Sequence, residues 1–91
     1  MEKLYLMEKT AIEPKDLIGT QWVGWSDMFR NRLKVEFVDK TNCIYTSKPN
    51  EFPMTYTVIG GKLFISEIND PFELRGDILF SGPLPVFEKV A

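Results

Sequence analysis

Residues 52–80 read FPMTYTVIGGKLFISEINDPFELRGDILF, and this stretch decides the fold. Two short runs of alternating apolar residues meet at Gly60-Gly61, where glycines supply the positive φ values of a tight turn between paired strands. A two-residue loop fixes the register of the hairpin. The expected cross-strand pairs are Val58 with Leu63, Tyr56 with Ile65 and Met54 with Glu67.

The hairpin has one clearly apolar face. We expect this face to lie in the core, and it carries Met54, Tyr56, Val58, Leu63 and Ile65. The other face is largely polar, because it carries Thr55, Thr57, Lys62 and Ser66. Its apolar exceptions are Ile59, Phe64 and Ile68.

A third apolar run, residues 72–80, follows Asn69-Asp70-Pro71. A three-residue turn would place the start of this run on the face of Ile68, whereas a turn of two or four residues places it in the core. We favour the second interpretation, which adds Phe72, Leu74, Ile78 and Phe80 to the core face. Gly76 would then lie opposite Ile65, and the whole stretch would form a three-stranded antiparallel meander.

Upstream of the meander, residues 14–19 (PKDLIG) predict one turn of helix, since proline suits its first position and glycine its exit. Leu17 and Ile18 would plug one end of the core. Residues 20–26 then predict a strand with a tryptophan on each face. We expect Trp22 in the core, because it directly follows the plug, and Trp25 at a rim.

Three further segments read as strands. Residues 29–38 place Leu33, Val35 and Phe37 inward, with a solvated basic row of Arg30, Arg32 and Lys34 outside. After a turn at 39–42, residues 43–47 point either Cys43 and Tyr45 or Ile44 inward, and we favour the former. Residues 84–90 form the last strand, at an edge or an imperfect closure, because Pro85 lacks an amide donor. Residues 1–13 are a seventh edge strand or a loose segment.

These segments predict a single all-β domain over residues 1–91. Consecutive hairpins without a crossover helix form an up-and-down antiparallel meander of six to seven strands. Such a sheet tends to curl, and closure removes exposed edges, so a small barrel, complete or incomplete, is favoured over a sandwich.

Composition excludes several function classes. A net charge of −2 provides no basic patch for nucleic acid. No stretch approaches the ~20 apolar residues of a membrane helix, and the start lacks the pattern of a signal peptide. We therefore expect a soluble protein, retained in the cell or freed from a leader.

The residues of common catalytic and metal sites are missing. The sequence has no histidine and a single cysteine, so it cannot form an internal disulfide or a structural zinc site. We expect Cys43 to be a small buried apolar residue, and no enzyme activity, metal or cofactor. Glu73, Arg75 and Asp77 are expected on a solvent-exposed outer face, where they would form weak cross-strand ion pairs.

A tentative ligand site combines one acid with an apolar interior. The hairpin register points Glu67 inward near the barrel mouth, where a carboxylate could hold the polar head of a ligand. Trp22, Met54 and Tyr56 would line the apolar part. Alternatively, Glu67 lies beyond the last strand pair and reaches solvent.

The start of the first full strand also carries a family resemblance. Leu17, Gly19, Thr20 and Trp22 within LIGTQW, followed by a strand meander, resemble the lipocalin-like (calycin) domains of bacteria. The resemblance implies that the tryptophan closes the bottom of a barrel and that the domain binds small apolar ligands or partner proteins. The chain is shorter than a full lipocalin, which implies a reduced barrel or a half completed by a second copy.

Two functions follow as hypotheses. The first is a non-enzymatic lipocalin-like domain that holds a small apolar ligand in the barrel. The second is a structural or interaction domain that homodimerises or belongs to a larger bacterial surface protein, through an exposed patch of Ile59, Phe64 and Ile68.

Overall fold

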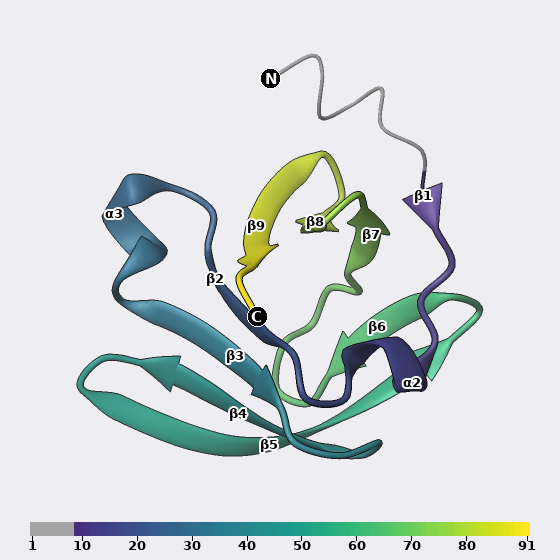
Figure 1. Cartoon of the computed structure of the whole chain (residues 1–91), viewed down its shortest axis with the longest axis horizontal. Helices are drawn as coiled ribbons and strands as arrows, with labels where there is room; N and C mark the ends of the chain where they lie inside the picture. The colour runs from purple at the N-terminus through teal and green to yellow at the C-terminus, as the bar shows by residue number, and fades with distance from the viewer. Residues whose placement is uncertain (1–8) are drawn as a thin grey trace.

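The computed structural model of the chain describes residues 9–91. In that range, nine strands and two single-turn helices follow one another (Figure 1). Their bounds are β1 (Lys9–Thr10), α2 (Pro14–Leu17), β2 (Gln21–Gly24), α3 (Asp27–Arg30), β3 (Leu33–Phe37), β4 (Asn42–Ser47), β5 (Asn50–Ile59), β6 (Lys62–Ile65), β7 (Glu73–Arg75), β8 (Ile78–Ser81) and β9 (Leu84–Lys89).

All strands belong to one antiparallel sheet with the order β1-β7-β8-β9-β2-β3-β4-β5-β6. Most neighbours in the sheet are also neighbours in sequence, as expected of a meander. The exception at the centre is β2, which pairs with β3 on one side and with β9 on the other. Figure 1 shows the sheet curling so that β1 and β6, the strands at the two ends of the sheet, approach each other.

Backbone hydrogen bonds join the two ends of this sheet. Leu63 of β6 and Phe72, just before β7, exchange two bonds of 2.9 and 2.7 Å between amide nitrogen and carbonyl oxygen. The Ile12 amide donates to the Gly61 carbonyl at 3.0 Å. These links confirm the predicted all-β, barrel-like meander. Within residues 9–91, no helix is long and apolar enough to cross a membrane.

The central hairpin has the predicted register. Tyr56 lies opposite Ile65 and Val58 opposite Leu63. Gly60 and Gly61 have φ of 60° and 78°, the left-handed conformation that this two-residue turn requires. Tyr56, Leu63 and Ile65 are buried, and Met54 and Val58 pack against them, which confirms the predicted core face.

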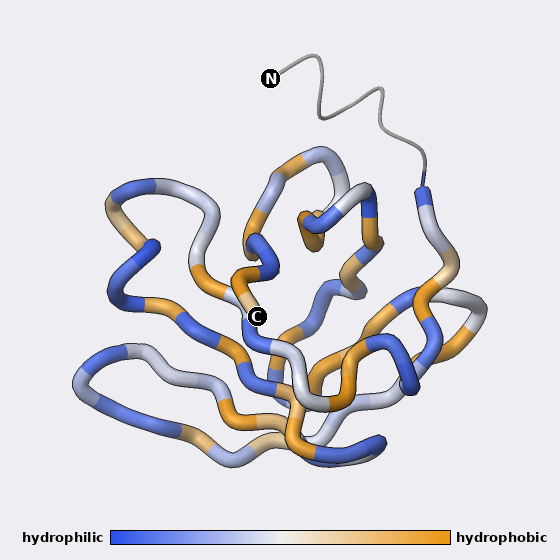
Figure 2. Tube along the Cα trace, viewed as in Figure 1, coloured by the Kyte–Doolittle hydropathy of each residue, from blue (hydrophilic) through white to orange (hydrophobic). Residues whose placement is uncertain are grey.

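The registers of β3 and β4 are also as predicted. Val35 and Phe37 are fully buried, and Leu33 packs against the core from the same face. Cys43 lies opposite Phe37 and Tyr45 opposite Val35, so the favoured inward orientation of both is confirmed. Figure 2 shows the resulting alternation of hydropathy along β3.

The predicted strand over residues 29–38 is too long at its start. Residues 27–30 form α3, whose first turn is closed by the Phe29 and Arg30 amides donating to the Ser26 carbonyl. Arg30 is therefore not part of a basic row on a strand. Its guanidinium instead pairs with Glu88 of β9, which ties α3 to the sheet.

Residues 72–80 form two strands rather than one, which corrects the predicted core face. Gly76-Asp77 is a two-residue turn, with Gly76 at φ 61°, and it pairs Leu74 with Leu79. Leu79 is therefore the inward residue of β8, and Gly76 does not lie opposite Ile65. Ile78 and Phe80 are buried on the opposite face, where the Arg75 guanidinium lies 5.3 Å from the centre of the Phe80 ring.

The last strand is not at an edge, contrary to one of the two predicted positions for Pro85. β9 lies between β8 and β2. The register of the β8–β9 pairing shifts between Leu79 and Phe80, and Phe80 pairs with Pro85, the residue that lacks an amide donor. The prediction that Leu17 and Ile18 plug the core is correct for Leu17, which is buried, and wrong for Ile18, which is exposed. The proposed N-terminal edge strand is present as β1, and residues 1–8 lie outside the described part.

Aromatic rings fill the space inside the curled sheet. The largest fully buried side chains include Trp22, Phe37 and Phe87. The Phe37 ring meets Tyr56 edge to face at 4.9 Å between centroids, and Phe72 lies 5.8 Å from Phe87. The predicted core position of Trp22 is confirmed.

The β3–β4 turn is organised by one carboxylate. Asp39 Oδ1 accepts hydrogen bonds from the backbone amides of Thr41 (2.9 Å) and Asn42 (2.8 Å), and both carboxylate oxygens accept from the Asn42 side chain. These bonds, chiefly that from the Asn42 side chain, lower the pKa of Asp39 from 3.8 to about 2.

This lowered pKa leads to a pH-dependent prediction for Asp39→Asn. Because the folded-state pKa lies below the unfolded value, the ionised carboxylate contributes stability above about pH 4, and the contribution is lost as pH falls towards 2. Urea unfolding of both proteins between pH 6 and pH 2 should give the wild type the higher free energy of unfolding at pH 6. The difference between the two proteins should become smaller as the pH falls. A gap that is the same at every pH would contradict this.

Candidate functional site

The four residues of the predicted ligand site do not line one cavity, because Met54 and Glu67 border one open depression whereas Trp22 lines a separate cleft. Trp22 is buried on β2, whereas Tyr56 is buried on β5 and donates its hydroxyl to the Asp39 carbonyl. The β5–β6 pairing ends at Tyr56 and Ile65, so the predicted pair of Met54 with Glu67 is not formed. Glu67 lies after the end of β6, exposed and at φ 66°, so the alternative in which it reaches solvent is the one observed.

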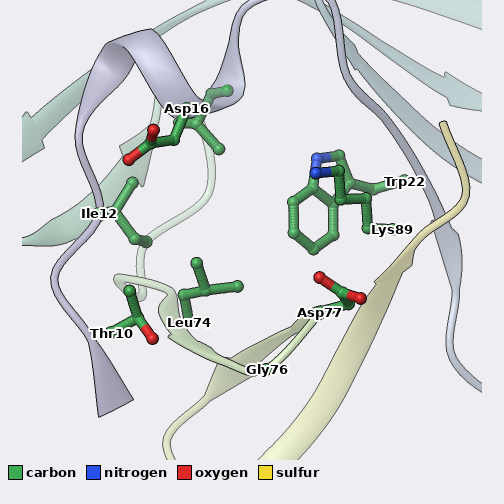
Figure 3. Close-up of a pocket in the computed structure, with 9 residues that line it drawn as sticks. Thr10, Ile12, Asp16, Trp22, Leu74, Gly76, Asp77 and Lys89 are labelled. Carbon is green, nitrogen blue, oxygen red and sulfur yellow. The ribbon is translucent and has the colours of Figure 1, made fainter.

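A cleft of about 280 Å³ opens instead at the α2 end of the sheet (Figure 3). Its walls come from β1, α2, β2, the β7–β8 turn and β9. Four apolar side chains form its floor, namely Ile12, Leu17, Trp22 and Leu74. Four polar side chains stand around it, namely Thr10, Asp16, Asp77 and Lys89, with Gly76 between them.

Local structure around α2 and the start of β2 explains how Leu17 and Trp22 come to form the floor of the cleft. The proline-led turn of α2 buries Leu17, and Gly19 leaves that turn at φ 81° so that the chain can enter β2. The Trp22 indole Nε1 donates to Thr20 Oγ1 at 2.9 Å, and the Thr20 hydroxyl donates to the Leu17 carbonyl. The buried hydroxyl therefore links the helical turn to the tryptophan.

Thr20→Val tests this link, because valine keeps the shape but leaves the indole N–H without its acceptor. A buried donor without a partner costs about 1–3 kcal/mol. We expect the free energy of unfolding in urea, followed by tryptophan fluorescence, to fall by that amount. Thr57→Val, at an exposed position of β5, is the control and should change it little. Equal effects of the two substitutions would contradict the assigned role.

The charges around the cleft come from separate elements. Asp16 belongs to α2, Asp77 to the β7–β8 turn and Lys89 to the end of β9, and all three are exposed. The Lys89 amide donates to the Asp77 carbonyl at 2.9 Å, so Asp77 and Lys89 lie on the same wall of the cleft. Among residues 9–91, the ion pairs are Lys9–Glu73, Lys15–Glu13 and Arg30–Glu88, so these three charges form none.

Two other depressions are larger but more open. One, of about 440 Å³, is lined by Met54 and Glu67 together with polar neighbours on β4 and β5. The other, of about 500 Å³, lies between Lys62, Glu73 and Leu84. Neither has a buried aromatic floor, so the cleft under Trp22 is the better-formed site.

The remaining reactive groups are engaged in the fold. Cys43 is buried, and desolvation raises the pKa of its thiol to about 11. Burial also raises the pKa of Tyr56. In the part of the chain that the structure describes, no group of three His, Cys, Asp or Glu side chains could hold a metal ion.

The apolar patch predicted on the outer face is smaller than expected. Ile59 (62% exposed) and Phe64 (37% exposed) lie on the outer face of the β5–β6 hairpin. Ile68 instead packs against the core, because the chain turns inward after β6. The patch therefore consists of two of its three predicted residues.

Sequence reasoning found Trp22 and the Leu17 plug but missed the charged rim. Asp16, Asp77 and Lys89 are far apart in sequence, and no motif connects them. Comparison of the chain with models of protein families, with curated proteins and with solved structures gives no match.

Proposed function

We propose that this chain is a non-enzymatic, lipocalin-like binding domain that takes a small ligand in the cleft under Trp22. The observation that carries the proposal is the combination of an aromatic floor with charged groups around it that form no ion pair within residues 9–91. Binding sites for small molecules typically combine an apolar surface with a few polar groups that fix orientation.

The ligand's place differs from that in a large lipocalin barrel. Side chains fill the interior of this sheet, with Trp22, Phe37, Leu63, Leu79 and Phe87 all at most 2% exposed. Small barrels are commonly filled in this way. The space left for a ligand is therefore at the end of the sheet rather than along its axis.

The volume limits the size of the ligand. At about 280 Å³, the cleft lies just below the range of about 300–1,000 Å³ found for small-molecule sites. A compound with one ring and a short chain fits this space. Larger compounds would extend past the rim into solvent.

The test fills the cleft at its rim. Thr10→Trp adds a bulky ring at an exposed lining position without removing any core side chain. We expect phenyl-bearing probes in the millimolar range to shift amide resonances of Leu74, Gly76 and Lys89 in the wild type, and not in Thr10→Trp. The matched control is Thr55→Trp, which fills the depression beside Glu67 and should leave binding intact. Absence of any shift at the cleft would overturn the proposal.

Self-association is a second candidate, favoured by the exposure of Ile59 and Phe64 on one outer face. Exposed apolar patches commonly mark protein interfaces. If the face joins two copies, Phe64→Glu should convert a dimer into a folded monomer in native mass spectrometry. Met28→Glu, at an exposed residue of α3, is the control and should leave the dimer intact. An unchanged mass distribution in Phe64→Glu would exclude this surface.

A further inference from the structure

We propose that the cleft selects organic cations, namely small amines with a single apolar ring. This inference rests on the proposed function and specifies the chemical class of the ligand.

The floor of the cleft requires an apolar body. Ile12, Leu17, Trp22 and Leu74 offer no free hydrogen-bonding group, because the indole N–H already donates to Thr20. A polar group placed on this floor would lose its water without gaining a partner. The part of the ligand that lies deepest is therefore a ring or a short aliphatic chain.

The charges around the floor favour a positive group on that body. Asp16 and Asp77 contribute two negative charges and Lys89 one positive charge, which leaves an excess of one negative charge. None of the three forms an ion pair within residues 9–91, so they are available to a ligand. A monocationic ligand neutralises the excess, whereas an anion would add to it.

The arrangement of the groups supports the same sign. In Figure 3 the Asp77 carboxylate lies between the Trp22 ring and the turn at Gly76, whereas the Asp16 carboxylate lies beside Ile12 and points away from the ring. A ring resting on Leu74 and Trp22 therefore has the Asp77 carboxylate beside it. The face of an aromatic ring also attracts a cation, so Trp22 adds to the preference for an amine.

Four probes with one ring and different charges test the inference. They are 2-phenylethylamine (cation), 2-phenylethanol (neutral), L-phenylalanine (zwitterion) and 3-phenylpropionate (anion), with Kd from resonance shifts at low salt. One exposed charge pair is worth up to about a fivefold change in Kd. We expect the amine to bind about fivefold more tightly than the alcohol and the propionate to bind most weakly.

Variants assign the preference to the cleft. Asp77→Asn should bring the amine to within about twofold of the alcohol, whereas Lys89→Gln should tighten amine binding by about twofold to fivefold. Asp27→Asn changes the net charge equally from a position on α3, and it should leave the order of probes unchanged. Added salt at 0.5 M should reduce the advantage of the amine, because exposed charges are screened.

The outcomes separate the two proposals. If none of the four probes shifts the cleft resonances, the proposed binding function itself fails. If the alcohol binds as tightly as the amine, or if phenylalanine or the propionate binds most tightly, the cleft is a binding site but the inference of a cationic ligand is wrong.

Discussion

Phe37→Ala should lower the free energy of unfolding by about 3–5 kcal/mol, as is typical when a buried phenylalanine is truncated. Phe37 is completely buried at the end of β3, and its ring meets Tyr56 edge to face. The substitution removes this contact and leaves a cavity that rigid strands on both sides cannot close. The loss is a large part of the about 5–14 kcal/mol expected for a domain of this length.

Urea unfolding monitored by tryptophan fluorescence measures this loss. The matched control is Phe52→Ala, since Phe52 has the same side chain on β5 but is 42% exposed. Its ring lies 6.4 Å from that of the partly buried Tyr45. We expect the control to lose clearly less stability than Phe37→Ala. Similar losses in both variants would mean that Phe37 is not a central core residue.

Gly24→Ala should lower the free energy of unfolding by about 1–3 kcal/mol, the usual cost of an overpacked position. An added Cβ would lie 2.7 Å from the Phe29 carbonyl oxygen and 2.8 Å from its carbonyl carbon. Because these are backbone atoms, no side-chain rotation relieves the clash. Helix α3 would have to move away from β2.

A comparison with Gly82 separates steric clash from backbone strain. Gly82 has φ 59° and open space around it, so its substitution to alanine strains the backbone alone. Asparagine tolerates this conformation, so Gly82→Asn should recover stability relative to Gly82→Ala. At Gly24 the order should reverse, with Gly24→Asn less stable than Gly24→Ala, because the larger side chain deepens the clash. The same order at both sites would contradict the steric role of Gly24.

The parts of the fold that sequence predicted correctly are governed by neighbouring residues. Gly60-Gly61 specifies a two-residue turn, and that turn alone sets the pairing of Tyr56 with Ile65. Alternation along residues 33–37 likewise fixes which side of β3 is buried. In each case local chemistry and the tertiary structure agree.

The prediction failed where alternation continued across a turn. Leu74, Ile78 and Phe80 lie an even number of residues apart on both sides of Gly76, so the sequence pattern alone predicts one face of one strand. The turn at Gly76-Asp77 places Leu79 inward, and burial of Ile78 and Phe80 on the other face hides the change from the sequence pattern. A sheet with both faces buried gives no alternation to follow.

The candidate site was predictable only in part for a similar reason. Trp22 could be found because it follows a helical plug in sequence. Asp77 and Lys89 reach the cleft only because β8 pairs with β9 and β9 pairs with β2. The pairing of β9 with β2 joins segments about 60 residues apart and leaves no local signal.

The position of β2 between β3 and β9 also has a consequence for folding during synthesis. β2 is synthesised early, but the strand that completes its second edge comes from residues 84–89. Until the ribosome has released that segment, the nascent chain exposes an open strand edge beside Trp22 and Gly24. Such an edge can pair with other chains, and sheets built on distant pairings form slowly. The interval between synthesis of β2 and arrival of β9 is therefore the period of greatest risk of aggregation.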